Sequence, residues 1–112
     1  MLEPHAHAAP QVSCGADANG DWRIELHGEI DLNTDPLLDA TLATVTDAAP
    51  GEILVDLTDV TFLASTGLGF LAQLRNHVAP AGHTVTLHAP HHAVRRALTL
   101  IGFDQHFRIT AP

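Results

Sequence analysis

The sequence has 112 residues, 46% of them hydrophobic, which predicts one domain around a single core and leaves no room for a second. Thirteen acidic residues against five lysines and arginines give a formal net charge of −8. This charge argues against nucleic acid or an anionic membrane as a partner and favours a basic protein surface. No apolar run approaches bilayer-spanning length and the N-terminus lacks the features of a signal peptide, so we expect a cytoplasmic protein.

The N-terminal part of the chain contains the only cysteine and a segment without pattern. Cys14 alone excludes an internal disulfide and a thiolate metal site within one chain, and we interpret it as a small residue on an early strand. Residues 1–10 are rich in proline, histidine and alanine without periodicity, which is typical of a flexible arm. The predicted domain therefore comprises residues 11–112.

A hairpin is expected next. Val12–Cys14 reads as a short edge strand, and Asn19 followed by Gly20 is a strong signal for a tight turn. From Trp22 to His27, apolar and polar residues alternate, which predicts a strand with one covered face.

A turn and a helix are expected after this hairpin. Gly28–Asp31 is predicted as the turn, and Asn33 or Thr34 as the cap of a helix that has Pro36 in its first turn. The helix ends before Pro50. Its predicted inward stripe is formed by Leu38, Leu42 and Val45.

The second half of the chain continues as strand, helix, strand, helix and a final strand. The predicted elements are a buried strand at 52–57, a helix to about Ala79, a strand at 84–88, a helix starting at His91 or Ala93 with Val94, Leu98 and Ile101 toward the core, and a strand at 107–109. This order predicts an α/β fold with a mixed sheet of four to five strands and helices packed mainly on one face.

The junction between the 52–57 strand and the next helix carries two adjacent hydroxyl groups. Either Ser65 or Thr66 could cap the helix by accepting from free backbone N–H groups, while Gly67 and Gly69 keep the first turn free of bulky side chains. A helix N-terminus favours negative charge, so a phosphate on Ser65 would lie in a favourable field.

Three segments together resemble the STAS domain, and in particular the bacterial anti-sigma factor antagonists. They are DLTDVTFLASTGLG at 56–69, GEID at 28–31, and the region from Ala93 to Phe107. The segments occur in the family's order and cover about the whole chain after Val12. The resemblance implies a single STAS-type domain.

The resemblance also implies a regulatory binding module and not an enzyme. In the family, the serine that matches Ser65 is phosphorylated by a partner anti-sigma factor with serine kinase activity, so Ser65 is the expected phosphoacceptor and Thr66 the second candidate. A serine phosphatase is a further expected partner. Nucleotide and magnesium would belong to the kinase, so the domain needs no cofactor of its own. The sequence departs from the family at Ala64, where the family usually has an aspartate.

The expected partner surface combines the predicted turn with the junction. A phosphate on Ser65 would add roughly −1.5 to −2 charges there and would eject a partner whose facing surface must desolvate or is acidic. Asp31 either contributes to this surface or is a turn carboxylate that accepts backbone N–H groups, while Asp56 is expected to orient the junction and Asp59 to form a turn. The expected surface comprises Gly28, Glu29, Asp31, Asp56, Ser65, Thr66, Gly67, Leu68 and Gly69.

Three alternative functions compete with this interpretation. Nine histidines suggest a metal site, but none forms an i, i+4 pair on a predicted helix or the mixed set with carboxylates expected of a zinc site, so no metal is expected. A triad of Ser65, a histidine and Asp56 lacks the G-x-S-x-G motif of a hydrolase. The third keeps the fold: Ala64 would mark a STAS domain that takes no phosphate and serves as a scaffold or transporter-associated subunit.

Overall fold

Strands and helices alternate along the chain after an opening hairpin. The computed structural model describes residues 11–112, so the predicted arm at 1–10 lies outside the described residues. The elements are β1 (Val12–Ala16), β2 (Trp22–Ile30), the 3-10 helix η2 (Leu32–Thr34), α1 (Asp35–Thr46), β3 (Ile53–Leu63), α2 (Ser65–Val78), η3 (Ala79–Ala81), β4 (Val85–His88), α3 (His92–Leu100), η4 (Phe103–Gln105) and β5 (Arg108–Thr110).

The five strands form one mixed sheet in the order β1-β2-β3-β4-β5. β1 and β2 are antiparallel, and their turn closes where the N–H of Gly20 donates to the carbonyl of Asp17 at 3.1 Å. The other neighbouring strands run parallel and are connected through helices. The predicted α/β fold with a mixed sheet is confirmed, and the carboxyl ends of β2, β3 and β4 point to one end of the sheet.

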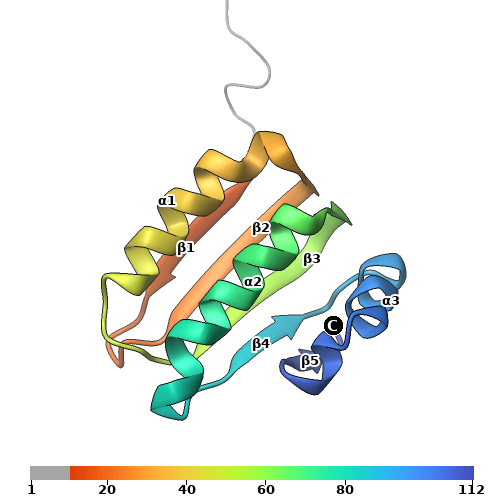
Figure 1. Cartoon of the computed structure of the whole chain (residues 1–112). Helices are drawn as coiled ribbons and strands as arrows, with labels where there is room; N and C mark the ends of the chain where they lie inside the picture. The colour runs from red at the N-terminus through yellow and green to blue at the C-terminus, as the bar shows by residue number, and fades with distance from the viewer. Residues whose placement is uncertain (1–10) are drawn as a thin grey trace, which may run out of the picture.

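Two of the helices cover one face of this sheet. Figure 1 shows α1 and α2 lying side by side across it, while α3 lies beyond β4, next to β5. α3 is held by Val94 and Leu98, which are buried, and it contacts the end of β3. The expectation that Ile101 also faces the core is wrong: α3 ends at Leu100, and Ile101 is 50% exposed.

The core lies between the sheet and the helices α1 and α2. The strands alternate as expected near their starts, so Ile24 and Leu26 of β2 point inward with Val55 and Leu57 of β3. The helices contribute one buried stripe each. These stripes are Leu38, Thr41 and Val45 on α1, and Gly67, Phe70, Leu71, Leu74 and Val78 on α2.

Two of the predicted boundaries are wrong because β2 and β3 pair irregularly. From the pair Trp22–Ile53 to the pair Ile30–Leu63, β2 advances 8 residues and β3 advances 10, because the register shifts twice on the way. Gly28 lies at one of these shifts with φ of +77°. The predicted turn at Gly28–Asp31 is therefore mostly strand, and β3 does not end at Leu57 but continues to Leu63.

Candidate functional site

The passage from β3 into α2 has no side-chain cap. Ala64 occupies the position before the helix, with extended backbone at φ −81° and ψ 175°, and a methyl group cannot accept a hydrogen bond. The N–H of Ala64 donates to the carbonyl of Ile30 at 2.9 Å, which ties the junction to β2. The prediction that Ser65 or Thr66 caps α2 is wrong, because both residues already belong to the first turn.

Ser65 is the first residue of α2 and its side chain is exposed. Within residues 11–112, neither the Ser65 hydroxyl nor the backbone N–H groups of Ser65 and Thr66 have a hydrogen-bond partner. Such free N–H groups at a helix N-terminus favour negative charge. The structure thus combines an exposed hydroxyl with two donors that can stabilise an anion attached to it.

Thr66 differs from its neighbour in both burial and bonding. Its side chain is half-buried, and its hydroxyl donates to the carboxylate of Asp35, the first residue of α1. A local hydrogen bond was the expected role of Thr66 besides modification, and this expectation is wrong. The partner lies on another helix, so this bond joins the first turns of α1 and α2.

Gly67 and Gly69 have different reasons to be glycine. A Cβ on Gly67 would lie 2.4 Å from Leu63 Cδ1 and 3.0 Å from Ile30 Cγ2, so the first turn of α2 packs directly against the ends of β2 and β3. A Cβ on Gly69 would meet no atom within 4 Å. Between them, Leu68 is half-buried and packs against the core. Of these two positions, only Gly67 requires a glycine for close packing.

The predicted second half of the partner surface lies at the same end of the sheet. Glu29 is exposed at the end of β2, paired in register with Phe62 of β3. The Asp31 carboxylate accepts from the N–H of Asn33 at 3.0 Å, and the Thr34 hydroxyl accepts in return from the N–H of Asp31 at 3.2 Å. This reciprocal pair caps η2, which leads directly into α1. The role of Asp31 as a turn carboxylate is confirmed.

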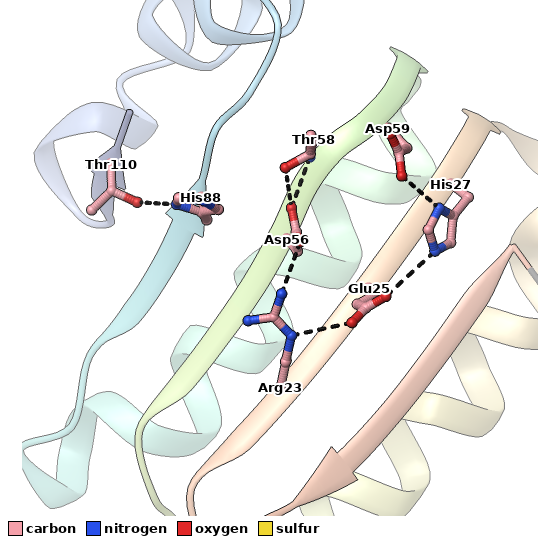
Figure 2. A network of polar contacts seen from close by, with 8 residues as sticks. All are labelled: Arg23, Glu25, His27, Asp56, Thr58, Asp59, His88 and Thr110. Atoms are coloured by element: carbon pink, nitrogen blue, oxygen red, sulfur yellow. Dashed lines mark hydrogen bonds and ion pairs between the residues drawn. The ribbon is translucent and has the colours of Figure 1, made fainter. Parts of the chain in front are cut away.

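Asp56 does not lie at this junction. Its side chain is on the sheet face away from α1 and α2, where it accepts from Thr58 N–H at 2.9 Å and pairs with Arg23 Nη2 at 3.0 Å (Figure 2). Partial burial acts to raise the pKa of the Asp56 carboxyl, but the Thr58 hydrogen bonds and the Arg23 charge outweigh it and leave the pKa below its usual value. The expectation that Asp56 orients the junction is not met.

The rest of this open face is a polar network. His27 Nδ1 lies 3.2 Å from a carboxylate oxygen of Asp59, and Glu25 is the next carboxylate along β2, 3.7 Å from His27 Nε2 (Figure 2). Asp59 is therefore a strand residue and not the predicted turn former. Across residues 11–112, no three His, Cys, Asp or Glu side chains are placed to hold a metal ion.

Comparison with known proteins identifies the family. The model of a STAS domain described as "Mlab, STAS domain" matches residues 14–110. The chain belongs to the STAS domain family. This STAS domain is 34% identical over 94 residues to the anti-sigma-F factor antagonist RsfB of Mycobacterium tuberculosis, across 84% of this chain and 76% of RsfB.

Solved structures agree with this assignment. A crystal structure of an anti-sigma factor antagonist from Mycobacterium paratuberculosis is 31% identical, with a TM-score of 0.72 over 93% of this chain and 90% of the other. The phosphorylated form of the Bacillus protein SpoIIAA, at 22% identity and a TM-score of 0.67 over 88% of this chain and 89% of that one, shares the fold. In the part of the STAS domain that the structure describes, no helix has both the length and the apolar character needed to span a bilayer.

Two exposed apolar residues near the junction of this STAS domain were not among the residues predicted from the sequence. Leu32, directly after Asp31, is 77% exposed, and Phe62, two residues before Ala64, is 54% exposed. Phe62 borders a hollow of about 230 Å³ between the end of β3 and α3, lined also by Val94 and Ala97. The available signal was their position: a leucine directly after the predicted turn at Gly28–Asp31, and a phenylalanine just past the predicted end of the 52–57 strand.

Proposed function

We propose that this domain is a cytoplasmic anti-sigma factor antagonist that binds an anti-sigma factor with serine kinase activity and is switched off by phosphorylation of Ser65. The observation that carries the proposal is the state of Ser65: an exposed hydroxyl without a partner in residues 11–112, at the uncapped start of α2. The similarity to RsfB, an anti-sigma-F factor antagonist, supports the choice of partner.

The proposed partner surface is the end of the sheet where β2 and β3 finish. It consists of Ser65 and the rest of the first turn of α2, the segment from Glu29 to Asp31, and the exposed side chains of Leu32 and Phe62. The two apolar side chains supply contact area, and the acidic groups Glu29 and Asp31 favour a basic facing surface. Asp56 is not part of this surface, because its side chain lies on the sheet face away from α1 and α2.

Phosphorylation would act by charge and not by unfolding. The Ser65 oxygen attacks the γ-phosphorus of the kinase's ATP, ADP leaves, and the hydroxyl proton passes to a base on the kinase. The product carries roughly −1.5 to −2 charges on a chain whose formal charge is already −8. Inside the domain the charge is tolerated, because the N–H groups of Ser65 and Thr66 have no partner in residues 11–112 and a helix N-terminus favours negative charge. The phosphate therefore weakens the complex while α2 stays folded.

The test combines intact mass with binding. The domain is incubated with the candidate anti-sigma factor and Mg-ATP, and affinity is measured before and after by calorimetry. We expect one added phosphate on the natural chain, none on Ser65→Ala, and affinity weaker by at least about tenfold after phosphorylation. Ser65→Ala should keep the affinity of the unmodified chain. Binding without any phosphate would overturn the switch, and absence of binding would overturn the antagonist function.

Ala64 favours a second candidate function. Without the aspartate that the family usually has at this position, the domain would take no phosphate and would serve as a scaffold or transporter-associated subunit. The same experiment separates the two proposals: the scaffold predicts that mass stays unchanged with every kinase offered. An added phosphate that disappears in Ser65→Ala would exclude it.

A further inference from the structure

Two adjacent hydroxyl groups stand at the start of α2, and the structure treats them differently. Ser65 is exposed and its hydroxyl makes no hydrogen bond to residues 11–112. Thr66 is half-buried, and its hydroxyl donates to the carboxylate of Asp35 on α1. Both residues are in the first turn of the helix, next to each other in the sequence. They differ in burial and in the bond to Asp35.

We propose that Asp35 is a specificity-determining residue that directs phosphoryl transfer to Ser65 by holding the hydroxyl of Thr66 against α1. This inference rests on the proposed function, because it concerns which hydroxyl of the same site accepts the phosphate. Asp35 acts through Thr66 and touches neither the nucleotide nor the transferred phosphoryl group. It is a positioning residue.

Two physical effects act against transfer to Thr66. Its hydroxyl proton is committed to a carboxylate, and a hydrogen bond to a charged group is among the stronger ones in proteins, so the bond must break before the oxygen can turn toward a γ-phosphate. The product would then place a phosphate of roughly −1.5 to −2 charges beside the Asp35 carboxylate. Ser65 avoids the first obstacle because its hydroxyl bonds to none of residues 11–112, and since it is exposed, solvent screens a phosphate placed there.

The location of Asp35 explains why no other carboxylate serves this purpose. It is the first residue of α1, and Figure 1 shows that α1 and α2 start at the same end of the sheet. Asp31 is engaged in capping η2. Asp39, one turn further along α1, is exposed and makes no hydrogen bond to the described residues, so it provides a control with the same change of charge.

The experiment uses the full chain with the candidate anti-sigma factor kinase and Mg-ATP, and locates phosphate by fragmentation mass spectrometry. On the Ser65→Ala background, we expect Asp35→Ala to speed phosphorylation of Thr66 by about tenfold or more, the factor that corresponds to loss of one charge-assisted hydrogen bond. Asp39→Ala should leave the rate unchanged. Asp35→Asn keeps an acceptor for Thr66 without the charge, so its rate should lie between those of aspartate and alanine.

Folding and bonding are checked without any kinase. Circular dichroism confirms that each variant is folded, and urea unfolding of Asp35→Ala, Thr66→Val and the double variant measures whether the two side chains are coupled. Additive effects in this cycle would overturn the bond and the proposal with it. A rise in Thr66 phosphorylation caused equally by Asp39→Ala would also overturn it, since charge alone would then be the cause.

The failure of this inference is distinguishable from failure of the proposed function. Phosphate on Ser65 of the natural chain, with no gain on Thr66 when Asp35 is replaced, overturns the selectivity and leaves the switch intact. Phosphate on Thr66 of the natural chain overturns the selectivity too, because Asp35 would then activate the hydroxyl. No phosphate on any variant overturns the switch itself, and the selectivity falls with it.

Discussion

The starts of α1 and α2 lie at the same end of the sheet but are built in opposite ways. Before α1 stands the 3-10 helix η2, which Asp31 and Thr34 cap reciprocally, and its Leu32 carbonyl accepts from the N–H of Asp35, the first residue of α1. Before α2, Ala64 offers no acceptor, and the N–H groups of Ser65 and Thr66 remain free within residues 11–112. One start is preceded by a capped 3-10 turn, whereas the other keeps its donors available to an external anion.

The difference shows where α2 obtains its stability. Loss of a cap typically costs about 1 kcal/mol, and α2 compensates through packing, with a buried stripe from Gly67 to Val78. Its junction is also fixed to β2 by the bond from Ala64 to Ile30. A helix anchored in this way can leave its first turn chemically open. Substitutions at Gly67, Asp31, Ala64 and Ser65 test this comparison, with Gly69, Asp39 and Thr66 as reference positions.

The largest effect is expected at Gly67, where packing replaces the missing cap. Gly67→Val places branched carbons where even a Cβ would lie 2.4 Å from Leu63 and 3.0 Å from Ile30, so it should lower the free energy of unfolding by about 3 kcal/mol. Urea unfolding measures the change. Gly69→Ala is the matched control: its site is open, so alanine should raise stability by about 0.5–1 kcal/mol through helix propensity. Equal losses at both positions would contradict this account of α2.

The second-largest effect is expected at Asp31, which caps η2 before α1. Asp31→Ala removes the acceptor for the N–H of Asn33 and should lower the free energy of unfolding by about 1–2 kcal/mol. Thermal and urea unfolding both report it. Asp39→Ala, at an exposed acid on α1, should change stability by less than about 0.5 kcal/mol. If the two variants behave alike, the capping bonds at η2 contribute nothing to the difference between the helix starts.

A cap can be added where it is absent. Ala64→Ser gives the extended residue before α2 a hydroxyl that can accept from the free N–H groups, and stability should rise by about 0.5–1 kcal/mol in urea unfolding. The added cap competes with a phosphate for these donors. The same variant should therefore gain less stability from phosphorylation of Ser65 than the natural chain. Lower stability in Ala64→Ser would mean that the donors are not free.

The smallest effect is expected at Ser65 itself. Since its hydroxyl bonds to none of residues 11–112, Ser65→Ala should leave the free energy of unfolding within about 0.5 kcal/mol of the natural value. Thr66→Val keeps the shape but loses the bond to Asp35, and should destabilise by about 1 kcal/mol. A loss at Ser65 as large as that at Thr66 would show that Ser65 has a structural role, and the two hydroxyls would no longer be distinguishable.

Most of the fold was predictable from periodicity and from turn residues. Alternation from Trp22 onward, helical spacing after Leu68 and the breaks at Pro50 and Gly82 are local patterns, and they placed the helices within a few residues. The end of β3 was not predictable in this way. Its buried residues Leu57, Val60 and Leu63 are three apart instead of two, because of the register shifts against β2, so the stretch does not look like a strand.

The candidate site was predictable as a position but not as a geometry. The motif placed Ser65 at the helix start, whereas its location one residue inside the helix depends on the backbone at Ala64. The bond between Asp35 and Thr66 joins residues 31 positions apart, so no local pattern indicates it. Asp56 was misplaced for a related reason: β3 runs on past it, and strand alternation turns its side chain to the other face.

The irregular pairing of β2 with β3 has a consequence for the thermodynamics of association. The ladder continues to the pair Ile30–Leu63, and Ala64 then bonds to Ile30, so the backbone on both sides of Ser65 is fixed before any partner arrives. A partner that docks here orders side chains but no loop, so binding avoids most of the conformational entropy that a flexible site loses. We therefore expect rigid-body docking, in which variants at this surface alter the lifetime of the complex more than its rate of formation.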